Sequence, residues 1–195
     1  RFHVVGTPAM AVDWRQIADR LEPEVEGPRL LHAENIFDSE GPTFPFGTHV
    51  AVVEVDRETG QVVVQRLIAC DDAGVILNPL LADGQIHGGL AQGIAQALME
   101  EFVYDEDGNP LTSNFADYAV ISAAELPMFE RVVLETPTHI NPLGAKGIGE
   151  SGTVGATPAV QNAVIDALSH LGVRHINMPT TPQKVWQAMR EVQGS

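Results

Sequence analysis

A glycine-rich segment is the feature that most constrains how this chain folds. Residues 141–155 read NPLGAKGIGESGTVG and contain glycine at positions 144, 147, 149, 152 and 155. Such a segment supplies few side chains to a core, but its backbone N–H groups can approach a ligand closely. We therefore expect a glycine-rich loop over 137–156 that leads into a helix N-terminus, which is a favourable place for an anion.

Two charged side chains, Lys146 and Glu150, lie within this segment. A single glutamate among glycines and next to a helix start is a candidate general base, and the helix dipole favours its ionised form. The alternative is that Glu150 caps the helix and that Lys146 is a solvated turn residue. The segment is not a phosphate-binding P-loop, because it lacks the first glycine spacing and the Lys-Ser/Thr pair.

A long helix with glycines in its interior is predicted from Asn78-Pro79 to about Glu101. Asparagine can cap a helix and proline is tolerated at its first position. The three interior glycines cost about 3 kcal/mol relative to alanine, which indicates that something approaches the backbone closely. The apolar stripe consists of Ile86, Leu90, Ile94 and Leu98, the glycines are Gly88, Gly89 and Gly93, and Gln85, Gln92 and Gln96 share one face.

Two interpretations of this glycine-containing helix remain open. Glutamine amides both donate and accept hydrogen bonds, so the glutamine face could hold a polar ligand. Alternatively, the glycines allow tight helix packing and the glutamines lie in solvent.

The remaining pattern predicts an α+β fold, because strands and helices do not alternate regularly. The sheet is expected to be mixed or antiparallel and to pack against two long helices and a C-terminal helix. The expected strands are 29–37, 49–55, 61–69 and 129–136, with a hairpin over 49–69, and the other expected helices are 12–21, 157–171 and one that begins at 181–182.

Charge and composition exclude several classes of function. The net charge of −15 opposes binding to nucleic acid or to anionic membranes. Cys70 is the single cysteine, so the chain cannot form an intrachain disulfide or ligate an iron–sulfur cluster. No apolar run approaches about 18 residues, so no membrane span is expected. Because the chain opens at Arg1, we expect a fragment, a processed chain or one subunit of a larger protein.

Two long motifs resemble the large, molybdenum-binding subunit of the xanthine dehydrogenase, aldehyde oxidase and aerobic carbon monoxide dehydrogenase family. They are NPLLADGQIHGGLAQGIAQALMEE at 78–101 and LGAKGIGESGTVGATPAVQNAVIDAL at 143–168. Shorter stretches at 44–60, 71–79 and 117–127 support them. The likeness covers nearly the whole chain and is strongest to the bacterial carbon-monoxide-dehydrogenase-like branch. It implies that residues 1–195 form one C-terminal segment of the molybdenum-cofactor-binding domain.

The resemblance implies a molybdenum hydroxylase that takes its oxygen from water and uses Glu150 as general base. The cofactor would be molybdopterin with molybdenum, in the cytosine dinucleotide form, with no protein ligand to the metal. The resemblance assigns cofactor contacts to Gly84, Gln85, Gly88, Lys146, Gly147 and Gly149. The substrate would be an aldehyde, an N-heterocycle or carbon monoxide.

The expected partners are the remainder of the large subunit, an FAD-binding medium subunit and a small subunit with [2Fe-2S] clusters, all in the cytoplasm. Ser151-Gly152 stands where eukaryotic xanthine dehydrogenases carry prolines, so purine oxidation is not implied. The alternative hypothesis is a structural domain that is inactive alone and binds cofactor only when paired with the rest of the large subunit. A naturally split subunit is a third possibility.

Overall fold

The computed structural model describes residues 1–20 and 34–194, which divide into two compact units, Arg1–Asp38 and Ser39–Ser195. The first unit contains a 3-10 turn, η1 (Pro8–Met10), and the short helix α1 (Trp14–Arg20). The Asp13 carboxylate accepts a hydrogen bond from the Gln16 backbone N–H at 2.9 Å, as expected for a cap of this helix. The second unit contains all other helices and strands of the described chain.

The second unit is built on a three-stranded mixed sheet in the order β1-β2-β3. Strand β1 (Phe46–Val55) pairs antiparallel with β2 (Val62–Asp72), which pairs in parallel with β3 (Phe129–Leu134). The register between β1 and β2 shifts at Val52/Val53, where β2 has one extra residue. The extra residue leaves two successive residues of β2, Gln65 and Arg66, both exposed, as is typical of a bulge.

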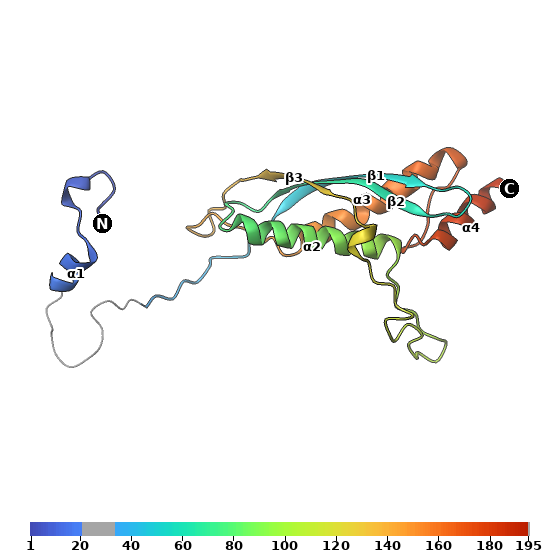
Figure 1. Ribbon diagram of the computed structural model, residues 1–195, viewed down its shortest axis with the longest axis horizontal. Helices are drawn as coiled ribbons and strands as arrows, with labels where there is room; N and C mark the ends of the chain where they lie inside the picture. Colours follow the sequence, from blue (N-terminus) through green and yellow to red (C-terminus); the bar gives the residue numbers. More distant parts are fainter. Residues whose placement is uncertain (21–33, 195) are drawn as a thin grey trace. The chain divides into compact units, whose positions relative to one another are not determined.

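Two long helices pack on one another and on the sheet, and Figure 1 shows them along one side of it. They are α2 (Pro79–Leu98) and α3 (Ser151–Leu168). Helix α4 (Pro182–Gln193) follows the short turn η3 (Ser169–Leu171), and η2 (Ala123–Glu125) precedes β3. The core includes Leu67 and Ala69 of β2, the predicted stripe Ile86, Leu90, Ile94 and Leu98 of α2, and Val160, Val164 and Leu168 of α3. The predicted α+β architecture is confirmed.

The glycines inside α2 let α3 approach its backbone. A Cβ atom added to Gly93 would lie 2.5 Å from the Cβ of Ala156, and one added to Gly89 would lie 2.9 Å from the Thr153 nitrogen. On α3, a Cβ added to Gly152 would lie 2.7 Å from the Ile86 carbonyl oxygen. At these positions the close approach predicted from sequence is helix packing.

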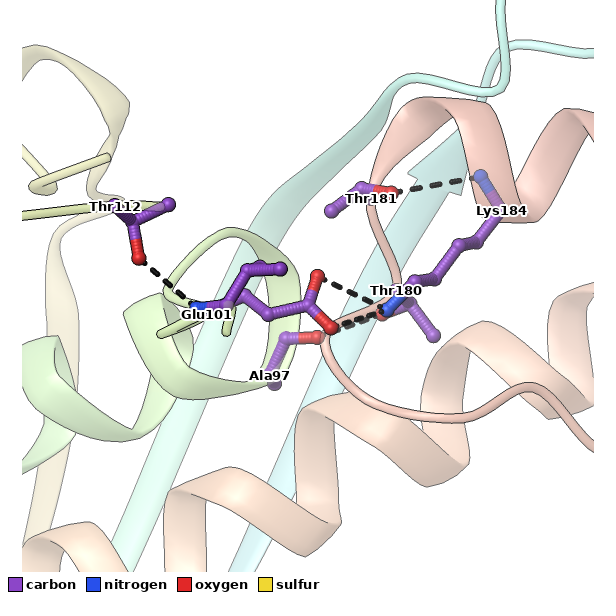
Figure 2. A network of polar contacts seen from close by, with 7 residues as sticks. Ala97, Glu101, Thr112, Thr180, Thr181 and Lys184 are labelled. Atoms are coloured by element: carbon purple, nitrogen blue, oxygen red, sulfur yellow. Dashed lines mark hydrogen bonds and ion pairs between the residues drawn. The ribbon is translucent and has the colours of Figure 1, made fainter. Parts of the chain in front are cut away.

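The C-terminal end of α2 is fixed to α4 by the polar contacts in Figure 2. Both the backbone N–H and the hydroxyl of Thr180 donate to the Ala97 carbonyl, at 2.7 and 2.8 Å. Lys184 of α4 donates to the Glu101 carboxylate at 3.1 Å. Thr181 caps α4 through the Lys184 backbone N–H, as Thr181-Pro182 predicts. These contacts join the end of α2 to the start of α4.

Two predicted elements are wrong where the structure describes them. The third helix begins at Ser151, six residues before the predicted Thr157 start, and Pro158 lies inside it. Packing of Gly152 and Ala156 against α2 outweighs the local preference for a proline-initiated helix. Of the predicted strand 29–37, residues 29–33 lie outside the described residues and 34–37 form no strand.

Candidate functional site

Glu150 is the residue immediately before α3, in the N-cap position. Its backbone carbonyl accepts the Val154 N–H at 3.0 Å, but its side chain makes no capping hydrogen bond. The side chain is exposed and has no hydrogen-bond or ion-pair partner among the residues that the structure describes. The helix-cap alternative is therefore wrong for its carboxylate, which is available for a ligand or a proton.

Several of the glycines singled out from the sequence have open space at their backbone. A Cβ added to Gly84, Gly88 or Gly147 would meet no atom within 4 Å. One added to Gly149 would lie 3.7 Å from Nε2 of Gln85, so the loop and the start of α2 are neighbours. The structure thus brings both glycine-containing segments together beside Glu150.

The three predicted glutamines of α2 have different surroundings. Gln92 accepts a hydrogen bond from the Thr153 hydroxyl, and Gln96 accepts one from the Thr157 hydroxyl, both at 3.2 Å. These two contribute to the packing of α3 on α2. Gln85 is exposed and its amide has no partner within the described chain, so it is the glutamine that remains open to a ligand.

Lys146 binds Asp72 at the end of β2. Its ammonium nitrogen lies 2.9 Å from Asp72 Oδ1 and 4.7 Å from the centre of the Phe46 ring. The side chain of Asp72 is 1% exposed and that of Lys146 is 10% exposed. Burial alone raises the pKa of Asp72, but hydrogen bonds from Thr136, Gly74 and Lys146 outweigh it and hold that pKa well below the ordinary range. Lys146 is therefore half of a buried ion pair rather than a solvated turn residue.

A second buried pair, His49 and Asp71, was not identified from the sequence. His49 Nε2 lies 3.1 Å from Asp71 Oδ1, and both side chains are 2% exposed. Buried ionisable groups are rare unless paired. Asp71 and Asp72 are the last two residues of β2 and follow the apolar stretch 67–70, and this position was the available signal for buried carboxylates.

A pocket of about 270 Å³ joins this pair to Glu150. Its lining comes from β1, the end of β2 and the first turns of α3: Pro45, Phe46, Gly47, His49, Asp71, Glu150, Ser151, Val154 and Gly155. The pocket therefore brings together the candidate base, the buried His49–Asp71 pair and apolar side chains such as Phe46 and Val154. Within residues 1–20 and 34–194, no three His, Cys, Asp or Glu side chains gather as they would to hold a metal ion. Nor does this part of the chain contain a helix long and apolar enough to span a membrane.

Comparison with protein families matches residues 2–127 to the molybdopterin cofactor-binding domain. The chain is 42% identical over 161 residues to the carbon monoxide dehydrogenase large chain of Hydrogenophaga pseudoflava, covering 83% of this chain and 20% of that protein. It is also 42% identical over 190 residues to the nicotine 6-hydroxylase large subunit of Paenarthrobacter nicotinovorans, covering 96% of this chain and 22% of that protein.

Among solved structures, the chain is similar to a Cu,Mo-CO dehydrogenase in its carbon monoxide reduced state. The TM-score is 0.78 at 38% identity, over 82% of this chain and 20% of that one. The chain thus spans about a fifth of the length of the relatives it matches. On this evidence it belongs to the molybdopterin cofactor-binding domain family and resembles the large subunits of the carbon monoxide dehydrogenase and xanthine dehydrogenase group.

Proposed function

We propose that this chain is the C-terminal portion of the large subunit of a molybdenum hydroxylase and that Glu150 is its general base. The observation that carries the proposal is the unpartnered Glu150 carboxylate at the start of α3, beside open glycine backbone and the free amide of Gln85. A base needs a lone pair that no other donor occupies, and Glu150 meets this condition among the described residues. Family membership supports the molybdenum-hydroxylase part of this proposal, and the assignment of Glu150 as base rests on its geometry.

The residues present fit a molybdopterin cofactor. Backbone at Gly84, Gly88 and Gly147 is open, so a ligand can approach it more closely than any side chain would allow. The Gln85 amide offers one donor group and one acceptor that are not used within the described chain. We assign these groups, with Gly149, to binding the cofactor in the cytosine dinucleotide form, which is shared with the remainder of the subunit.

When bound, molybdopterin supplies a molybdenum centre that accepts two electrons from the substrate. Glu150 accepts the proton that leaves the reacting group, on one of its carboxylate oxygens. Phe46 and Val154 line the same pocket as Glu150 and give it an apolar surface. Gln85 orients the cofactor through its amide. Lys146, which the resemblance assigns to cofactor contact, also forms an ion pair with Asp72 at the end of β2.

The proposal extends to substrates and partners that lie outside these residues. Water is the oxygen source, and the substrate is an aldehyde, an N-heterocycle or carbon monoxide. FAD and [2Fe-2S] clusters reside in medium and small partner subunits, and the enzyme works in the cytoplasm. Residues 1–195 act as one C-terminal segment of the cofactor-binding domain. By themselves they provide only part of the pocket, so the isolated segment is inactive.

Metal and pterin analysis tests this proposal. The full-length subunit, purified with its partner chains, is expected to contain stoichiometric molybdenum and pterin, while residues 1–195 alone contain neither. Absence of both from a folded full-length complex contradicts the proposed function. Stoichiometric molybdenum on the 195-residue segment contradicts the claim that the pocket is shared.

A further inference from the structure

We propose that the adjacent carboxylates of Asp71 and Asp72 position Glu150 from its two flanks, Asp72 through Lys146 and Asp71 through His49. This inference rests on the proposed role of Glu150. Neither aspartate is assigned to the chemistry, and neither pair contacts solvent appreciably. They are positioning residues, because they act on Glu150 through the backbone that precedes and follows it.

Successive side chains of a strand point to opposite faces, so two adjacent aspartates at the end of β2 face opposite sides of the sheet. Asp71 lies on the side that α3 covers, with His49 of β1. Asp72 lies opposite Phe46 in the register, and Lys146 contacts both residues. The C-terminal end of β2 is therefore linked to the loop before Glu150 and to helix α3 after it.

The Asp72 side fixes the loop before Glu150. Asp72 Oδ1 accepts from Lys146 Nζ and from the Gly74 N–H, each at 2.9 Å. The Lys146 N–H donates to the Ala73 carbonyl at 2.8 Å, and the Gly144 carbonyl accepts the Val75 N–H at 3.0 Å. These contacts hold the chain four residues before Glu150 against the end of β2.

The Asp71 side fixes the helix after Glu150. Asp71 orients the His49 ring through Nε2, and the other ring nitrogen, Nδ1, is buried with no hydrogen-bond partner. The ring instead lies against Gly155 of α3, where an added Cβ would be 2.4 Å from Nδ1. The ring therefore sets the height of α3 above the sheet, five residues after Glu150.

This arrangement leaves Glu150 itself free. Since no contact within the described chain holds its carboxylate, only the backbone on its two sides determines where the base lies. A misplacement of about 1 Å at a reacting group can cost about 100-fold in rate. Loss of either pair is thus expected to lower kcat without removing any group that touches the substrate.

The test uses the full-length enzyme complex with Asp72→Asn, Lys146→Met and the double variant. Each single variant is expected to lower kcat by about 10–100-fold, with an unchanged KM. The double variant removes the buried charge altogether, so it is expected to recover the melting temperature of the wild type. Its kcat stays as low as in the single variants, because the same link is broken in all three. Arg66→Met is the matched control, because it removes the exposed Arg66–Glu130 pair on the same sheet and is expected to leave kcat unchanged.

Deuterium exchange in the cofactor-free complex provides a readout that does not depend on turnover. Backbone amides of residues 144–150 are expected to exchange faster in Asp72→Asn, and those of 151–156 faster in His49→Gln, with no such change in Arg66→Met. His49→Gln is also expected to lower kcat. The glutamine amide can still hydrogen-bond to Asp71, but glutamine lacks the imidazole ring that lies against Gly155.

Several outcomes overturn the inference. A wild-type kcat in Asp72→Asn contradicts the claim that Asp72 positions Glu150 through Lys146. If kcat falls in Lys146→Met but not in Asp72→Asn, the lysine contacts the cofactor directly instead. Recovery of both melting temperature and kcat in the double variant shows a purely structural pair. A wild-type kcat and wild-type deuterium exchange in His49→Gln contradict the claim that Asp71 positions Glu150 through His49. The proposed function is tested separately by Glu150→Gln. An inactive Glu150→Gln variant supports the proposed function in all these cases, and an active Glu150→Gln variant contradicts it.

Discussion

Glu150→Gln is expected to lower kcat of the complete enzyme by about 10²–10⁴-fold, the usual loss when a general base is removed. Glutamine has nearly the same shape but its amide cannot accept the proton. The wild-type carboxylate makes no hydrogen bond within the described chain, so the substitution breaks no contact that holds the fold. Molybdenum content and melting temperature should therefore equal those of the wild type, and the loss should lie in kcat.

Glu54→Gln is the matched control for this variant. It makes the same chemical change on β1 at an exposed carboxylate whose partner is Gln65, and it is expected to leave kcat unaltered. If Glu150→Gln retains kcat within about tenfold of the wild type, Glu150 is not the base, since that loss is below the usual range for one.

Gly93→Ala is expected to destabilise the chain by about 1–3 kcal/mol, the usual cost of overpacking a core. Alanine gains up to about 1 kcal/mol of helix propensity over glycine, but its Cβ would lie 2.5 Å from Ala156 Cβ and 2.9 Å from the Thr157 nitrogen. Neither atom belongs to a flexible side chain, so α2 and α3 must separate. The overpacking cost should dominate, and a lower midpoint of denaturant unfolding measures it.

Gly88→Ala on the same helix is the matched comparison. Its Cβ would meet no atom within 4 Å, so it should stabilise the isolated chain by up to about 1 kcal/mol through helix propensity. The two substitutions are therefore expected to have opposite signs. Shifts of the same sign would contradict the assignment of Gly93 to helix packing and of Gly88 to an open face.

The parts of the fold with strong local signals were predictable. Asn78 caps α2 and Thr181 caps α4 as their sequences indicate, and the predicted hairpin at 49–69 corresponds to β1 and β2 with their turn. The start of α3 was not predictable locally. Thr157-Pro158 is a better start signal than Glu150-Ser151, and only the contact of Gly152 with Ile86 and Gly89 explains the earlier start.

Only some residues of the candidate site could be named from the sequence, and the contacts that each of them makes could not. Sequence places Gln85, Gln92 and Gln96 on one face, yet Gln92 and Gln96 accept hydrogen bonds from α3 and only Gln85 stays open. The pairing of Lys146 with Asp72 joins residues 74 positions apart. Such a pair depends on sheet register and on the path of the loop, and neither can be read from a local motif.

The most direct test of the central claim is the structure of the full-length enzyme with its cofactor. The account predicts a Glu150 carboxylate oxygen within hydrogen-bond reach of the molybdenum centre or its bound substrate, about 2.6–3.2 Å or one water away, with Gln85 and the open backbone of Gly84 and Gly88 against the cofactor. A cofactor that contacts neither Gln85 nor Glu150, or a Glu150 carboxylate taken up by an ion pair with another part of the subunit, would contradict it.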